Sequence, residues 1–162
     1  MRYFITFACY GAHLHGVESG SVDRRHNVVG NRLVEPDLQR VRAEQEWMDQ
    51  PSYTLDELSR ATVLNSVSSV CRYRGWILHA AHVRTNHVHV IVEAEDKPER
   101  VLNALKAYSS RSLNNLRRDT AGRKRWARHG STRWLWTDQE TCDAIRYVVE
   151  EQGEPMAVYV AK

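Results

Sequence analysis

Two strand-like segments joined by a very short turn lie near the middle of the chain, and they constrain its fold more than any other feature. Residues 76–83 and 87–94 are rich in apolar and β-branched types. Between them, Arg84-Thr85-Asn86 leaves room only for a tight turn. The sequence therefore predicts an antiparallel hairpin.

Capped helices flank this hairpin on both sides. Thr54-Leu55-Asp56-Glu57 matches a capping box and predicts a helix that ends near Gly75. Asp96-Lys97-Pro98-Glu99 predicts the start of a second helix, running to about Arg118. Strand-like segments at 3–10 and 131–136 complete the order β-α-β-β-α-β. This order predicts an α+β, ferredoxin-like (split βαβ) antiparallel sheet with helices packed mainly on one face.

The chain is predicted to form one domain that spans residues 1–162, and the remaining segments are additions to its core. They are a long insertion after the first strand (11–53), a basic loop (117–133) and a terminal helix (138–152). With 42% hydrophobic and 27% charged residues, the composition is that of a folded soluble protein and excludes a disordered chain. The 3 cysteines form no C-x-x-C pair, so a reducing cytoplasm is expected. No apolar run predicts a membrane span.

His87-Val88-His89 is the sharpest chemical pattern. Alternation along a strand places His87 and His89 on one face, where two imidazoles can share a metal ion. They could equally be ordinary sheet histidines. With a three-residue turn, Val83 would lie opposite His87, Ala81 opposite His89 and His79 opposite Ile91. A second pair, His13 and His15, lies in a predicted loop and is a weaker candidate.

Tyr108 is predicted on the helix that follows the hairpin. It shares an apolar stripe with Val101 and Leu105, which favours a core tyrosine. The stripe turns polar at Ser112 and Asn115, which would suit a helix that lines a site.

Six basic residues and one acid lie between Arg117 and Arg128. Together with Trp126, Trp134 and Trp136, this segment could bind a phosphate backbone and stack bases. The alternative is a solvated loop with the tryptophans in the core. The basic side chains expected at a DNA interface are Lys106, Arg111, Arg117, Arg118, Arg123, Lys124, Arg125, Arg128, His129 and Arg133.

Two of these motifs together resemble a known family. The run N-H-V-H-V-I-V (86–92), followed by L-K-A-Y-S-S-R-S-L-N (105–114), resembles the single-tyrosine HUH transposases, in particular the REP-associated tyrosine transposases. The segment from Trp126 to Arg133 and the loop that starts at Tyr10 are similar to this group as well. The resemblance covers nearly the whole chain.

The resemblance implies an endonuclease that nicks and rejoins single-stranded or hairpin DNA in transposition, through a covalent 5′-phosphotyrosine. It implies that Tyr108 is the nucleophile and that His87 and His89 bind Mg²⁺ or Mn²⁺. The third metal ligand is then Ser112, which stands where the family has a Gln or Asn. Ser112 is a weaker ligand that could act through water, or His79 or Asn115 could take its place. Relatives include monomers and homodimers.

Two other functions fit the same sequence. A domesticated protein could bind DNA hairpins and cut them weakly or not at all, as the Ser112 departure suggests. An RNA-binding module of similar topology would place aromatic side chains on its central strands, where this chain has histidines.

Overall fold

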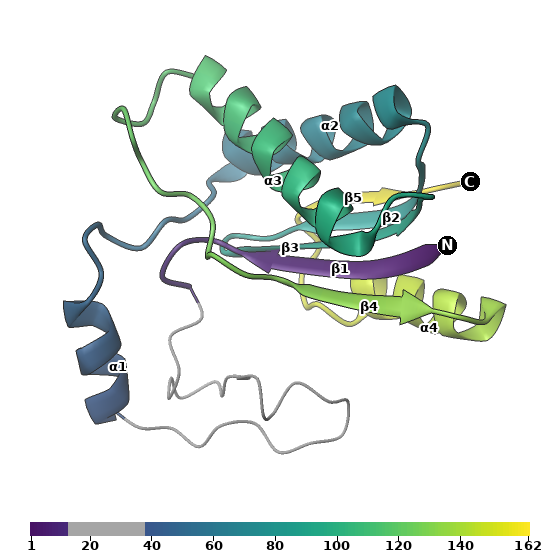
Figure 1. Ribbon diagram of the computed structural model, residues 1–162, viewed down its shortest axis with the longest axis horizontal. Coiled ribbons are helices and arrows are strands. Elements are labelled where there is room, and N and C mark those ends of the chain that lie inside the picture. The colour runs from purple at the N-terminus through teal and green to yellow at the C-terminus, as the bar shows by residue number, and fades with distance from the viewer. Residues whose placement is uncertain (13–37) are drawn as a thin grey trace.

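Five strands form one antiparallel sheet in the computed structural model, which describes residues 1–12 and 38–162 (Figure 1). The strands are β1 (Arg2–Ala8), β2 (Ile77–Val83), β3 (His87–Glu93), β4 (Ser131–Leu135) and β5 (Ala157–Val160). Their order across the sheet is β4-β1-β3-β2-β5. The first four strands have the split βαβ arrangement, so the predicted ferredoxin-like fold is confirmed.

Helices cover both faces of this sheet. Figure 1 shows α2 (Glu57–Arg74) and α3 (Pro98–Asn115) together on one face and α4 (Asp138–Glu150) on the other. The short α1 (Leu38–Glu46) lies to one side. The two faces are called here the α2/α3 face and the α4 face.

Local signals fix the helix ends. The Asp56 side chain accepts a hydrogen bond from the Ser59 N–H, so Asp56 caps α2, and Gly75 ends the helix in the left-handed conformation at φ 70°. Thr137 and Glu140 form a complete capping box at the start of α4.

The core shows which side chains of β3 point to which face. Val88, Val90 and Val92 belong to the main hydrophobic core beneath α2 and α3. Ile91 instead packs with Val148 of α4 in a smaller cluster. Because side chains alternate along a strand, His87 and His89 lie with Ile91 on the α4 face.

The predicted hairpin register is wrong by one residue. Val83 pairs with Val88 and His82 pairs with His89, since the Arg84 N–H donates to the His87 carbonyl and shortens the turn to Thr85-Asn86. A shift in register between Leu78 and Ala80 leaves His79 in a bulge, rather than opposite Ile91. The structure thus places His82, not Ala81, beside His89.

One strand was not predicted. β5 follows Gly153 and pairs antiparallel with β2, which makes it an edge of the sheet. The histidines His13 and His15 lie outside the described residues. No helix in the described parts of the chain is long and apolar enough to cross a bilayer.

Candidate active site

His87 and His89 lie side by side on β3, on the α4 face. Their ring centroids are 4.7 Å apart. The Nδ1 atom of His87 is 2.7 Å from the Asn86 Oδ1, and the Nδ1 atom of His89 is 2.8 Å from the Thr6 hydroxyl on β1. Both rings are therefore oriented by contacts at Nδ1, which is how ligating histidines are usually held.

Burial sets the charge of His89. Its ring is almost inaccessible, and burial, together with the neighbouring His87, lowers the pKa of His89 to about 3. The imidazole is neutral at physiological pH, which is the form that binds a metal. The Thr6 hydroxyl can accept from or donate to Nδ1, so it suits either neutral tautomer.

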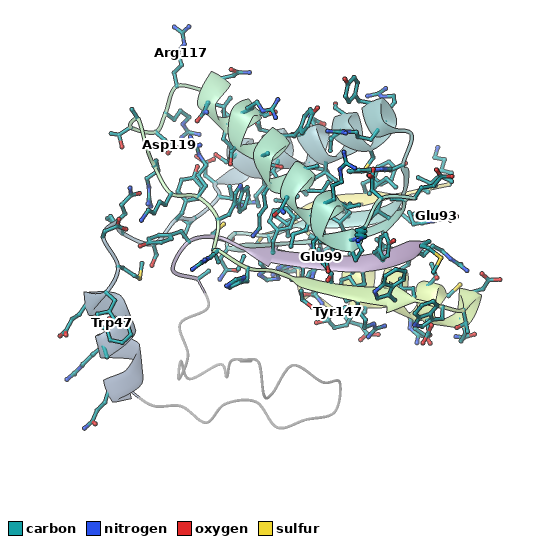
Figure 2. The ribbon with its side chains drawn as sticks, in the orientation of Figure 1. Trp47, Glu93, Glu99, Arg117, Asp119 and Tyr147 are labelled. Atoms are coloured by element: carbon teal, nitrogen blue, oxygen red, sulfur yellow. The ribbon has the colours of Figure 1, made fainter. Side chains whose placement is uncertain are left out.

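Tyr147 on α4 is the tyrosine that lies against His89. Its ring centroid is 6.0 Å from that of His89 and 6.0 Å from that of Phe4 on β1. Tyr147 remains 41% exposed, so solvent can reach its side chain. Figure 2 shows Tyr147 below the sheet, on the side that α4 covers.

Gln152 follows the end of α4 and also faces His89. Its Nε2 donates to the Tyr147 carbonyl, which also accepts the Glu151 N–H at the end of the helix. This bond fixes the orientation of the amide and turns Oε1 toward His89, where it lies 3.1 Å from Nε2. The side chains on the α4 face thus bring two imidazoles, a phenol and an amide oxygen together.

The structure does not bring Tyr108 or Ser112 to the histidines. Both side chains line a groove between α2 and α3, on the opposite face of the sheet. Tyr108 packs near Tyr73, with ring centroids 6.4 Å apart, and Arg111 lies over its ring. His79 and Asn115 make no contact with the pair either: His79 is 3.5 Å from Glu93, and Asn115 is the last residue of α3.

The donor set fits a divalent metal only if Gln152 takes part. Among residues 1–12 and 38–162, no group of three His, Cys, Asp or Glu side chains converges on one point. His87, His89 and the Gln152 amide oxygen are neutral nitrogen and oxygen donors at one place. Such a set binds Mg²⁺ weakly and Mn²⁺ more strongly.

Several basic residues predicted at a DNA interface make hydrogen bonds or ion pairs within the protein. Lys106 is buried, and its ammonium donates to the carbonyls of Ala127, Arg128 and His129 at 2.9, 3.4 and 3.0 Å. Arg125 is buried and bonded to Asp119 at 2.8 Å. Three more are tied to protein groups: Arg118 to Asp56, Arg123 to Gln50 and the carbonyls of Pro51 and Ser52, and Lys124 to Asp49.

The others are exposed, and Arg133 is the one beside the site. Its guanidinium lies 5.8 Å from the centre of the Phe4 ring, which in turn contacts His89 at 5.6 Å. Arg117 projects from the end of α3, away from the body (Figure 2), with φ at 53°. Arg111, Arg128 and His129 are exposed as well.

Of the three tryptophans near the basic segment, one packs on the core and two are exposed. Trp126 packs against the core, and its indole N–H donates to the Lys106 carbonyl and the Ser110 hydroxyl. Trp134 and Trp136 are exposed at the sheet edge and stack on each other, with centroids 5.2 Å apart and planes at 8°.

Comparison with known proteins identifies the family. The model of the IS200-like transposases matches residues 51–152. A solved structure of a REP-associated tyrosine transposase bound to a REP hairpin is similar over 93% of this chain, with a TM-score of 0.50 and 12% identity, and this chain spans 65% of that protein. At this identity the likeness supports the fold alone.

A protein assigned as a transposase from Deinococcus radiodurans R1 aligns with 94% of this chain and 90% of its own, with a TM-score of 0.45 and 17% identity. No curated protein matches the sequence. The family match runs from the segment before α2 to the Gln152 beside the histidines. The chain therefore belongs to the IS200-like transposase family.

Proposed function

We propose that this transposase cuts and rejoins single-stranded DNA through a covalent 5′-phosphotyrosine formed on Tyr147. The observation that carries the proposal is the contact of Tyr147 with His89, on the face where His87 and Gln152 also lie. Tyr108, which the sequence motif suggested, lies across the sheet from the histidines and is not the nucleophile in this proposal.

In the proposed reaction, the Tyr147 phenol oxygen attacks the scissile phosphorus and the bond from phosphorus to the 3′ oxygen breaks. The phenol proton goes to solvent, and the departing 3′ oxygen takes up a proton to become a hydroxyl. Because the phosphotyrosine is still a phosphodiester, the 3′-hydroxyl can attack it and restore the strand without ATP.

His87, His89 and Gln152 would hold the divalent metal, Mg²⁺ or Mn²⁺. When bound there, the ion would polarise the phosphate and offset the charge that develops on it. Thr6 orients the His89 ring, and burial keeps that ring neutral and available as a ligand. The Tyr147 carbonyl keeps the Gln152 amide oxygen turned toward the same point.

Hairpin DNA is the proposed substrate, because the similar transposase structure contains a REP hairpin. Arg133 lies next to Phe4 at the margin of the site and would bind a phosphate beside the one that is cut. Arg117, Arg128 and His129 are exposed, and we keep them as further proposed contacts to the DNA backbone.

A covalent-capture experiment tests the proposal. The protein is mixed with Mn²⁺ and end-labelled single-stranded hairpins copied from the flanks of its own gene, and the products are denatured in SDS. We expect a labelled band at protein mass that disappears with EDTA and in Tyr147→Phe, and that persists in Tyr108→Phe.

The two tyrosine variants are matched, because each removes only a phenol oxygen. An adduct that survives in Tyr147→Phe but is lost in Tyr108→Phe would overturn the assignment. Hairpin binding without any adduct in the wild type would instead indicate the domesticated DNA-binding protein. Equal affinity for RNA and DNA hairpins would favour the RNA-binding module.

A further inference from the structure

His82 on β2 is fully buried and connects the sheet to the segment that carries Tyr147 and Gln152. Its Nδ1 is 2.8 Å from the carbonyl oxygen of Val148, the residue after Tyr147. Its Nε2 accepts a hydrogen bond from the Met156 N–H at 3.2 Å. The two bonds thus hold the chain on either side of Gln152.

Both ring nitrogens of His82 are used by these bonds. A carbonyl oxygen can only accept, so Nδ1 carries the proton, and Nε2 offers its lone pair to Met156. His82 pairs with His89 across the strands and is the third imidazole near the candidate metal ligands. With no lone pair left over, it cannot be a ligand in this arrangement.

The other contacts of α4 with the sheet are mostly apolar. Ala144 and Val148 meet Ala80, Ile91 and Leu135 in a cluster on which Phe4, Ile145 and Val149 also pack. At the start of the helix, the exposed Asp138 accepts a hydrogen bond from Arg2 at 2.6 Å. The main core lies on the other face of the sheet. Beyond Gln152, the Arg84 guanidinium donates to the Glu154 carbonyl at 2.9 Å, in an exposed position. His82 is therefore a fully buried polar attachment of this segment, in addition to the contact between Gln152 and His89.

We propose that His82 is a positioning residue, which clamps α4 and the segment after it so that Tyr147 and Gln152 stay aligned with His87 and His89. The proposal rests on the proposed function for its catalytic meaning. The clamp itself is a property of the free protein and can be measured without DNA or metal.

The experiment uses His82→Phe, which keeps a ring of similar size and removes both hydrogen bonds. His82→Asn is the conservative variant, since its amide can still donate to the Val148 carbonyl. The control is His79→Phe, a histidine of the same strand that contacts Glu93 instead of α4. Hydrogen exchange followed by mass spectrometry is read for residues 138–156 and, as internal reference, for α2, α3 and β1.

In His82→Phe we expect amides of 138–156 to exchange roughly tenfold faster while the reference segments are unchanged. In the capture assay we expect adduct formation to slow about 10- to 100-fold, with the hairpin affinity retained, because misplacing a reacting group lowers the rate of the chemical step. His82→Asn should recover part of both effects, and His79→Phe should show neither.

Unchanged exchange in 138–156, or equally faster exchange in all segments, would overturn the clamp. Adduct formation that falls only as much as hairpin affinity would also contradict it. If His82→Phe does not fold, the comparison of His82→Asn with wild type decides, since one of the two bonds is then missing. A wild type that forms no adduct would refute the proposed function, while the exchange data would still decide whether His82 holds α4.

Discussion

The Oε1 of Gln152 and the Nε2 of His89 face one another at 3.1 Å, although one residue follows the last helix and the other lies in a central strand. We predict that Gln152→Ala weakens Mn²⁺ binding by about tenfold or more, because an oxygen donor of the site is lost. Electron paramagnetic resonance of free Mn²⁺ measures the affinity. Gln139→Ala, at the exposed start of α4, is the control and should bind like wild type. Equal affinities in the two variants would remove Gln152 from the metal site.

Thr6→Val is predicted to disturb the same site from the β1 side. The substitution keeps the shape and β-branching of the side chain but leaves the His89 Nδ1 without the hydroxyl 2.8 Å away. Loss of such an orienting partner should weaken Mn²⁺ binding about 10- to 100-fold, and the missing hydrogen bond should cost about 1 kcal/mol of unfolding free energy. Thr132→Val on β4, opposite Ile5 and facing away from the site, is the control. A metal affinity unchanged in Thr6→Val would show that the ring needs no such support.

Lys106→Met tests whether the buried lysine is structural. Three carbonyls of the segment before β4 would lose their donor, and we expect the unfolding free energy in urea to fall by about 1–3 kcal/mol. Arg111→Met on the same helix removes an exposed cation over Tyr108 and should change stability by less than about 0.5 kcal/mol. If Lys106→Met were as stable as wild type and lost only DNA affinity, the original prediction of a DNA contact would stand.

Acid should destabilise the protein through His89. Burial lowers the pKa of His89 from 6.5 to about 3, so between these pH values the unfolded chain binds a proton that the folded chain does not. The unfolding free energy contributed by this residue is complete above pH 6.5 and is lost as the pH falls toward 3. The measurement is urea unfolding in the presence of EDTA at pH values from 7.5 down to 5. The unfolding free energy should fall less steeply with pH in His89→Gln than in wild type. His129→Gln, an exposed histidine, should follow the wild-type curve, and parallel curves for all three would refute the prediction.

The strands and helices of the core could be predicted because their signals are local. The alternation of β3 placed His87 and His89 on one face, and the run Asp96-Lys97-Pro98-Glu99 located the start of α3. The hairpin register depended on the length of the turn, which the Arg84–His87 hydrogen bond makes one residue shorter than predicted, so the wrong neighbour was predicted for His89. β5 was missed although Ala157-Val158-Tyr159-Val160 is rich in strand-forming types.

The choice between tyrosines could not be made from local patterns. Tyr108 and Tyr147 both lie on amphipathic helices beside apolar positions, and only the sheet shows that α3 and α4 pack on opposite faces. A signal for the second tyrosine was present in the sequence: Tyr147 is followed by Gln152 just beyond the helix, an amide at a helix end where a ligand can be held.

The pairing of β1 has a consequence for how the protein is made. β1 is bonded to β3 on one side and to β4 on the other, so a strand that is translated before both of its partners lies inside the sheet. On the ribosome it emerges well before either partner, with Tyr3, Ile5 and Phe7 still uncovered. An apolar strand with two unpaired edges is prone to aggregate. Slow translation or a shortage of chaperones should therefore lower the yield of folded protein, even though the finished sheet leaves no edge of β1 open.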